Sequence, residues 1–244
     1  MASRIHGFPS GVVEPIWLSR DDAELKAHFA YTGAKAGDVA AAVELVSDLA
    51  IPFLTHVRRR LPAGACFVAP HAREATGDNA IPQVLAQACA MLAEGEADTD
   101  IVQISRVFHT GADPMERMAT RADFEGLVTP GKPHVLVDDV TTMGGTLAEL
   151  ANFIQIHDGV VAAVVVLVNA GRLKYLHPDP PLVRQIQSRH GHEIEQILGI
   201  HPAALTANEA TYLIGFRSTD EIRNRLAKAR QETDLRLRSK GIAR

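Results

Sequence analysis

The chain has 244 residues, of which 46% are hydrophobic and 22% are charged, and this is the composition of an ordinary soluble globule. No apolar run reaches membrane-spanning length, since VVAAVVVLV at residues 160–168 is only as long as a strand. The N-terminus lacks the apolar core of a signal peptide, and Cys66 and Cys89 have no CxxC spacing. We therefore expect a cytoplasmic protein with no membrane partner and with buried or half-buried thiols.

The formal net charge of −4 is unevenly distributed along the chain. Residues 217–244 contain nine Lys or Arg against four acids, so the remainder is acidic. A basic C-terminal segment is typical of a nucleic-acid-binding element or of a solvated helix. We favour the solvated helix and keep nucleic acid as an alternative partner.

The N-terminal part of the chain gives weak structural signals. Residues 1–20 alternate apolar residues with Gly and Pro, which indicates irregular or short-strand structure. Residues 28–38 are expected to form a loop that exposes Tyr31 and Lys35.

Helical spacing of apolar residues begins at residue 39. A helix is predicted over residues 39–60, and Pro52 is expected to bend or divide it. A strand follows at residues 65–69, ACFVA, and ends at Pro70. The next helix is expected over residues 81–91.

Strands and helices then alternate along the chain. A second strand is predicted over residues 100–107, followed by a polar run with a short helical pattern at residues 115–124. A helix at residues 147–156 precedes a β-branched run at residues 160–169, which suits a strand buried on both faces. This alternation predicts an α/β fold with a doubly wound parallel sheet, in which ligands bind at the carboxyl ends of the strands.

The sequence changes character after Gly171. A stiff segment, HPDPP at residues 177–181, is followed by a predicted helical appendage, and Thr206 with Glu209 forms a capping-box pattern. Further helices are expected at residues 182–187, 193–198 and 220–238. The expected organisation is an N-terminal segment with hood elements and a helix (1–60), an α/β core (61–172) and a helical C-terminal appendage (173–244).

The most informative segment is HVLVDDVTTMGGTLAE, residues 134–149. It predicts a strand that ends in Asp138 and Asp139, a turn rich in glycine and hydroxyl groups, and a helix. The glycines allow backbone N–H groups to approach an anion, and the helix start adds the positive end of its dipole. The carboxylates can accept hydrogen bonds from a diol. Together these features predict a ribose 5-phosphate site.

Within this segment, VLVDDVTTMGGT resembles the phosphoribosyl pyrophosphate (PRPP) loop of type I phosphoribosyltransferases. In that family two acidic residues close a strand and a TTGGT-like turn follows. The resemblance implies that Asp138 and Asp139 hold the ribose hydroxyls and that the turn holds the 5-phosphate. The turn residues are Thr141, Thr142, Met143, Gly144, Gly145 and Thr146. The alternative is an ordinary strand, turn and helix of an α/β protein, while the glycine turn argues against a response-regulator acid pocket.

The resemblance also implies a pyrophosphate loop after the first core strand. His71, Ala72 and Arg73 fall where the family's loop contacts pyrophosphate. The following stretch GDNAIPQVLAQ, residues 77–87, is loosely similar to the ComF-like branch of the family. Arg73 is either a phosphate ligand or a surface arginine beside Glu74.

The polar run before residue 131 falls where the family carries a mobile lid that closes over PRPP. The chemistry requires cations aimed at the leaving pyrophosphate in a site that excludes water. The candidates are Arg106, Arg117 and Arg121. The alternative is a solvated loop in which these arginines pair with nearby acids, namely Glu116, Asp123 and Glu125.

We therefore expect a PRPP-dependent phosphoribosyltransferase that transfers ribose 5-phosphate to a nitrogen acceptor and releases pyrophosphate, with Mg²⁺ bound mainly by the pyrophosphate. Thr142 stands where families that salvage 6-oxopurines usually carry an acid, so that type of purine salvage is not expected. Met143 replaces a common threonine. Such an appendage serves in the family as a hood over the active site or as an oligomerisation element, and a homodimer is one expected partner arrangement. The alternatives are a non-catalytic PRPP- or nucleotide-sensing regulator and a nucleic-acid-associated protein.

Overall fold

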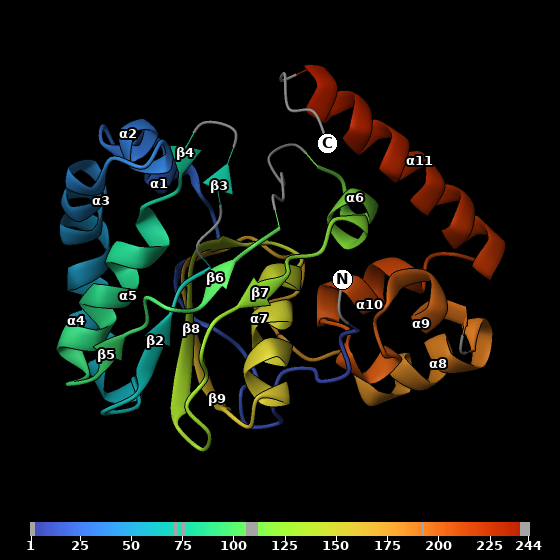
Figure 1. Cartoon of the computed structure of the whole chain (residues 1–244), viewed down its shortest axis with the longest axis horizontal. Coiled ribbons are helices and arrows are strands. Elements are labelled where there is room, and N and C mark those ends of the chain that lie inside the picture. Colours follow the sequence, from blue (N-terminus) through green and yellow to red (C-terminus); the bar gives the residue numbers. More distant parts are fainter. Residues whose placement is uncertain (1–2, 71–72, 75–76, 106–111, 192, 240–244) are drawn as a thin grey trace.

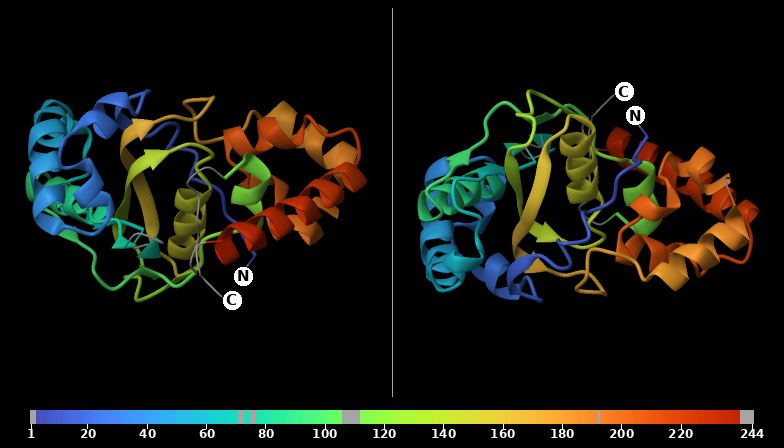
Figure 2. Two further views of the ribbon diagram at one scale, coloured as in Figure 1. Left: turned by 90° about the horizontal axis from the view of Figure 1, so that it is seen from above. Right: turned by 90° about the horizontal axis from the view of Figure 1, so that it is seen from below.

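The computed structural model describes residues 3–70, 73–74, 77–105, 112–191 and 193–239, with only the backbone described for 73–74, 77–78 and 236–239. Figure 1 shows a central sheet with helices on both sides, and a group of C-terminal helices that lies beyond α7 (Gly145–Ile156) on one of these sides. The two further views in Figure 2 show the same order of layers.

Five parallel strands form the sheet in the order β1, β9, β8, β2, β5. Their bounds are β1 (Ile16–Ser19), β9 (Val160–Asn169), β8 (Pro133–Thr141), β2 (Cys66–Val68) and β5 (Glu96–Ala97). Because all five strands are parallel, their carboxyl ends meet at one edge of the sheet, and β8 brings the acid pair to that edge.

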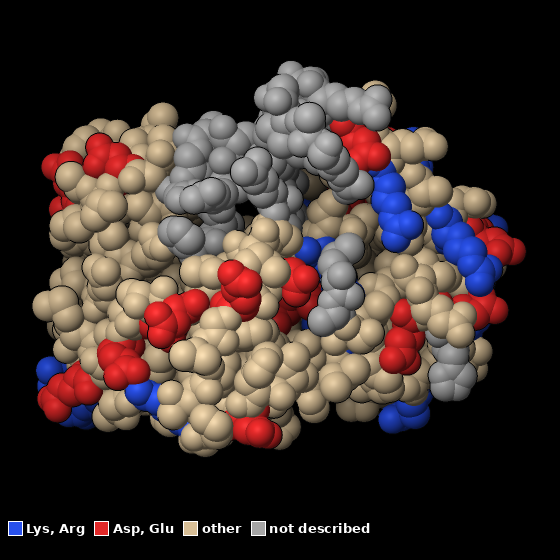
Figure 3. All heavy atoms as spheres, in the orientation of Figure 1, with Lys and Arg blue, Asp and Glu red and all other residues tan. Residues whose placement is uncertain are grey.

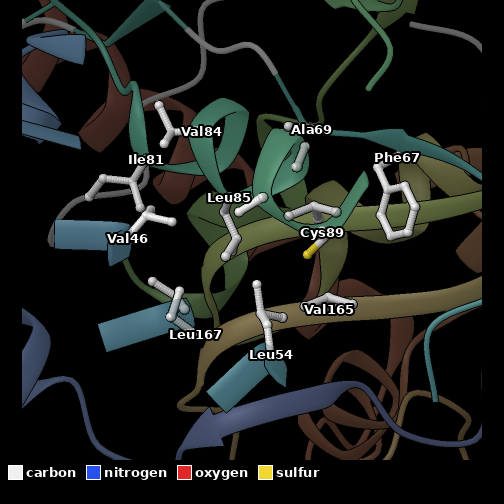
Figure 4. Close-up of a cluster of buried hydrophobic side chains, with 14 of the residues drawn as sticks. Val46, Leu54, Phe67, Ala69, Ile81, Val84, Leu85, Cys89, Val165 and Leu167 are labelled. Atoms are coloured by element: carbon white, nitrogen blue, oxygen red, sulfur yellow. The ribbon is translucent and has the colours of Figure 1, made fainter. Parts of the chain in front are cut away.

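The two central strands divide their side chains between two hydrophobic cores. Val135 and Val137 of β8 lie in the core on one face, which Figure 4 shows in part, whereas Leu136 lies in the core on the other face. This alternation suits a strand that is buried on both sides. Helices therefore cover both faces, which confirms the predicted α/β fold with a doubly wound parallel sheet.

Helices α1 to α5 and α7 supply the outer layers. The first face is covered by α3 (Val39–Leu45), α4 (Ile51–Val57) and α5 (Ile81–Leu92), with α1 (Ala23–Ala27) and α2 (Tyr31–Lys35) nearby, and the second by α7 (Gly145–Ile156). The predicted interruption at Pro52 takes the form of a π-helical turn, η1 (Val46–Ala50), just before the proline. Proline has no N–H to donate, and a local change in winding accommodates it.

The helical stretch Val39–Arg60, which ends in the 3₁₀ turn η2 (Arg58–Arg60), is long and apolar enough to cross a membrane by length and composition alone. In the structure its inward side chains, including Leu45 and Leu54, pack in the first core. Core packing on that side accounts for part of its apolar character, while Val39 and Val43 are exposed on the other side.

The strand predicted over residues 100–107 is present only as the two-residue strand β6 (Val102–Gln103) and lies outside the main sheet, while residues 106–107 lie outside the described part of the chain. β5 takes the edge of the sheet instead, and β6 pairs with β7 (Phe124–Glu125) in an antiparallel ribbon. The side chain of Asp98 explains the difference, because its Oδ1 accepts hydrogen bonds from the N–H groups of Asp100 and Ile101. Such a turn leads the chain away from the sheet after β5.

The prediction of a loop over residues 28–38 was wrong, since residues 31–35 form helix α2. The helix packs Ala34 into the first core with no exposed surface, so tertiary contacts favour it over a loop. A second antiparallel ribbon, β3 (Arg73–Glu74) with β4 (Gly77–Asp78), lies between β2 and α5 in the sequence.

The C-terminal helices have a hydrophobic core of their own. They are α8 (Pro180–His190), α9 (Glu193–Leu198), α10 (Ala207–Leu213) and α11 (Thr219–Ser239), with a 3₁₀ turn, η3 (Pro202–Ala204). This unit, residues 180–239, is called the C-terminal helical unit below. Helix α6 (Pro114–Ala119) inserts Met115 and Met118 into its core. The predicted helical appendage and the Thr206–Glu209 capping box are confirmed.

Basic side chains on α11 are interleaved with acids. Arg223 pairs with Glu193 and Asp220, and Arg225 pairs with Asp113 and Glu232. Figure 3 shows blue and red side chains next to one another on that side of the molecule. This arrangement is that of a solvated, ion-paired helix, and nucleic-acid binding by α11 stays a prediction.

Candidate functional site

The two carboxylates at the end of β8 have different surroundings. Asp139 is 4% exposed, and its Oδ2 accepts hydrogen bonds from Lys35 Nζ at 3.2 Å and from Asn79 Nδ2 at 3.1 Å. Asp138 is half-buried, and its Oδ1 accepts the backbone N–H of Asp139 at 2.9 Å. The protein itself therefore supplies a counter-ion to Asp139, and both acids line a cavity.

Burial raises the pKa of Asp138 well above its ordinary value, and the neighbouring charge of Asp139 raises it further. Lys35 acts in the opposite direction. Two carboxyl groups placed side by side do not ionise independently, so one of them retains its proton more strongly. Perturbed acids of this kind gather at functional sites.

The turn after the acid pair contains a left-handed residue and backbone N–H groups without an acceptor among the described residues. Gly144 has φ +78°, in the left-handed region that favours glycine, and it precedes the 12-residue helix α7. Among the residues that the structure describes, none accepts a hydrogen bond from the backbone N–H groups of Met143, Gly144 or Gly145. Unpaired N–H groups at the positive end of a helix dipole favour an anion.

A cavity of about 320 Å³ adjoins the carboxyl end of β8. The acid pair and the whole turn, residues 141–146, line it. Tyr31 and Lys35 of α2 also line it, as does Pro70, which follows β2. The structure thus brings the predicted ribose and phosphate residues to one cavity, whose volume lies in the range of small-molecule sites.

Arg121 lies in the cavity wall and is held by α7. Its guanidinium donates two hydrogen bonds to the Glu149 carboxylate, at 2.6 and 2.8 Å, and its Nη1 donates to the Leu198 and Gly199 carbonyls. The bidentate contact between Arg121 and Glu149 is buried and fixes the orientation of the guanidinium. Sequence reasoning did not connect Arg121 with Glu149.

Arg117 also lines the cavity, from helix α6. Its Nε donates to the Ala112 carbonyl at 3.1 Å, and burial lowers the pKa of its guanidinium. The third lid candidate, Arg106, lies outside the described residues. The catalytic roles of these three arginines stay predictions.

The predicted pyrophosphate loop is described only in part. His71 and Ala72 lie outside the described residues, and the backbone of Arg73 forms part of β3 while its side chain is not described. Asn79, from the stretch similar to the ComF-like branch, does reach the site through its hydrogen bond to Asp139. The likeness to that branch stays a prediction.

Sequence reasoning missed a buried network of charges beneath the turn. Arg4, with no exposed surface, donates to Glu209 Oε2 at 2.5 Å and lies 3.5 Å from Glu149 Oε1, and Glu149 in turn binds Arg121. Two positive and two negative groups thus offset one another away from water. The sequence does contain an indication of this network, because the acid Glu149 interrupts the apolar pattern of residues 147–154. All of these residues are buried in α7.

Three acids outside the cavity also lie close together. Oxygen atoms of Asp113, Glu116 and Glu232 lie within 4.8 Å of one another. Asp113 and Glu116 form the capping box of α6, and Arg225 pairs with Asp113 and Glu232. Local hydrogen bonding and ion pairing explain this cluster without a metal ion.

Comparison with known proteins gives sequence relatives of greater length. No protein-family model matches the chain. It is similar to Protein TraN of Escherichia coli, with 35% identity over 240 residues, which make up 94% of this chain and 53% of that protein. It is also 31% identical over 149 residues to an uncharacterized protein of Haemophilus influenzae, covering 60% of this chain and 32% of that one. The chain therefore spans about half or less of each relative's length.

Solved structures with some likeness are adenine phosphoribosyltransferases. The enzyme from Leishmania donovani matches with a TM-score of 0.37 and 18% identity, covering 80% of this chain and 87% of that chain. The enzyme from Thermoanaerobacter pseudethanolicus matches with a TM-score of 0.35 and 14% identity, covering 53% of this chain and 71% of that chain. These scores are too low to support an argument, so the fold rests on the strand order and the site on its own geometry.

Proposed function

We propose that the chain binds PRPP and transfers its ribose 5-phosphate to a nitrogen acceptor, with release of pyrophosphate. One observation supports this above the others: the acid pair lines the same cavity as the glycine turn, whose N–H groups have no acceptor in the part of the chain that the structure describes. Carboxylates suit a diol, and a helix start with free N–H groups suits a phosphate. A ribose 5-phosphate presents both groups a few ångströms apart.

In this proposal the protein acts mainly by positioning and electrostatics. Asp138 and Asp139 accept hydrogen bonds from the ribose hydroxyls, and the turn holds the 5-phosphate so that C1 of the ribose faces the cavity. As the bond to pyrophosphate breaks, positive charge develops on the sugar ring, and the nearby carboxylates stabilise that charge. A nitrogen nucleophile then attacks the opposite face of the ring.

Mg²⁺ would be held mainly by the pyrophosphate, whose charge it would neutralise as the group leaves. The residues present fit such an ion, because the half-buried Asp138 offers carboxylate oxygen to the cavity while Lys35 and Asn79 already engage Asp139. The acceptor would enter between the turn and α2, where Tyr31 and Lys35 line the wall. Thr142 also lines the cavity, and it has no carboxylate that could interact with a 6-oxopurine.

A second candidate is a PRPP- or nucleotide-binding regulator that does not turn its ligand over. The firm attachment of Arg121 to Glu149 favours it, since a guanidinium already held by a carboxylate is less able to move toward a leaving group. Both candidates require the same ribose phosphate site, and they differ only in whether pyrophosphate is released.

Isothermal titration of the native chain with Mg·PRPP tests the shared site. We expect native binding, with at least a tenfold loss in Asp138→Asn and in Asp139→Asn, because each removes a charged acceptor of the diol. Asp179→Asn, an exposed acid outside the cavity, is the matched control and should bind like the native chain. Absence of native binding would contradict both candidates. Pyrophosphate release with a panel of bases and amines separates enzyme from regulator.

A further inference from the structure

Backbone carbonyl groups of the turn at residues 141–146 contact residues outside the turn. Met143 O accepts a hydrogen bond from Thr206 Oγ1 at 2.6 Å, and Gly145 O accepts one from Arg4 Nη1 at 3.4 Å. Thr142 O packs so closely on Gly171 that a Cβ at that glycine would lie 2.5 Å away. Three backbone carbonyls of the turn are therefore directed toward other segments of the protein.

This arrangement determines where the N–H groups of the turn point. In a trans peptide the C=O and the following N–H lie on opposite sides of the bond, and the described chain contains no cis peptide. A Met143 carbonyl directed at Thr206 therefore directs the Gly144 N–H away from Thr206. That N–H has no acceptor among the described residues, and Gly144 lines the cavity.

Thr206 is well suited to hold the Met143 carbonyl in place. Its hydroxyl also accepts the Glu209 N–H at 3.1 Å as the N-cap of α10, so both its donor and an acceptor site are in use. The residue is 2% exposed, and its methyl group lies 3.4 Å from where a Cβ at Gly144 would be. The hydroxyl is thus buried and held by the first turn of a helix.

We propose that Thr206 is a positioning residue that couples the C-terminal helical unit to phosphate binding. Its hydroxyl orients the Met143–Gly144 peptide so that the Gly144 N–H is presented to the 5-phosphate before the ligand arrives. Preorganised donors of this kind favour binding because no reorganisation is needed when the anion enters. The inference rests on the proposed PRPP site and assigns part of its geometry to a residue 63 positions from Met143.

Three variants isolate the hydroxyl. Thr206→Val has nearly the same shape but cannot donate to Met143, whereas Thr206→Ser keeps the hydroxyl. The matched control is Thr211→Val in the same helix, because the Thr211 hydroxyl bonds only within α10, to Ala207 O at 2.8 Å. Thermal midpoints and Kd values for Mg·PRPP are measured on the full chain for all three variants.

We expect Thr206→Val to bind Mg·PRPP about fivefold to tenfold more weakly, Thr206→Ser to bind within about twofold of native, and Thr211→Val to bind like native. Amide hydrogen exchange gives a second readout, and Thr206→Val should accelerate exchange of the Leu147 and Ala148 amides, in the first turn of α7, as the turn loosens. If Thr206→Val does not fold, Thr206→Ala replaces it. A purely structural role predicts lower thermal midpoints with native Kd values.

Native affinity in a folded Thr206→Val variant would overturn this inference while leaving the PRPP site in place. Absence of PRPP binding by the native chain would overturn the proposed function and this inference together. The two failures are therefore distinguished by the native titration alone.

Discussion

Lys35 Nζ lies 3.2 Å from Asp139 Oδ2, so helix α2 supplies the counter-ion of an acid that follows it by 104 residues. The Asp139 side chain is 6% exposed and that of Lys35 is 24% exposed, so water screens this pair less than a surface pair. The contact ties the N-terminal helices to the carboxyl end of β8. Two segments that line the cavity, α2 and the end of β8, are thereby linked electrostatically.

Replacing Lys35 should destabilise the fold. Lys35→Met leaves the buried Asp139 with Asn79 but without its cation, and we expect a loss of about 1–2 kcal/mol in unfolding free energy. Urea unfolding followed by circular dichroism measures the change. The matched control is Lys26→Met, which breaks an exposed i,i+4 pair with Asp22 and should leave the unfolding midpoint almost unchanged. Equal effects of the two substitutions would contradict the prediction.

Removing the charge of Asp138 and removing that of Asp139 should change the stability of the fold in opposite directions. The pKa of Asp138 is raised in the folded state, so its favourable contribution is present below the ordinary value of 3.8 and is lost as the pH rises through the raised pKa. Asp138→Asn should therefore be more stable than the native chain at pH 7, with a difference that shrinks as the pH falls toward 4. Urea midpoints at several pH values measure this.

Asp139→Asn is the matched comparison at the neighbouring position. It removes the carboxylate that pairs with Lys35, and we expect it to be less stable than the native chain at pH 7. Stabilisation by both substitutions, or by neither, would show that the two carboxyl groups do not differ in the way described. In the proposed function both carboxylates accept hydrogen bonds from the diol, so Mg·PRPP binding should weaken at least tenfold in both variants.

Gly144 should be required for both stability and binding. With φ +78°, an alanine there is strained by about 1–2 kcal/mol. Gly64, with φ +68° and open space around it, provides a control with the same backbone strain far from the turn. We expect Gly144→Ala and Gly64→Ala to lower the unfolding free energy alike, and only Gly144→Ala to weaken Mg·PRPP binding in titration calorimetry. Reduced binding in both variants would indicate a general effect of lost stability.

The two thiols should be inert in the folded protein. Burial raises the pKa of Cys66 and of Cys89 to about 12, so little thiolate forms near neutral pH. At pH 8 we expect a disulfide reagent such as DTNB to react slowly with the native chain and rapidly with both thiols in urea. Fast labelling of one thiol in the native state would show local opening around that cysteine.

Local chemistry was enough to predict the centre of this protein. The run VLVDD has the β-branched, apolar character of a doubly buried strand, and the glycines that follow permit the left-handed backbone of a tight turn before a helix. The C-terminal helices were predictable for a similar reason. Thr206 and Glu209, which are only three residues apart in the sequence, form the capping box that starts a helix. These features depend on neighbours in the sequence.

Only the tertiary structure determined which distant residues complete the site. Lys35 reaches Asp139, Arg121 binds Glu149 and Thr206 binds Met143 because three separate parts of the chain converge on the carboxyl end of β8. A lysine in a short polar segment or a threonine at a helix cap has the same local pattern wherever the segment packs. Such contacts follow from the folding of the whole chain, so local periodicity and capping signals do not specify them.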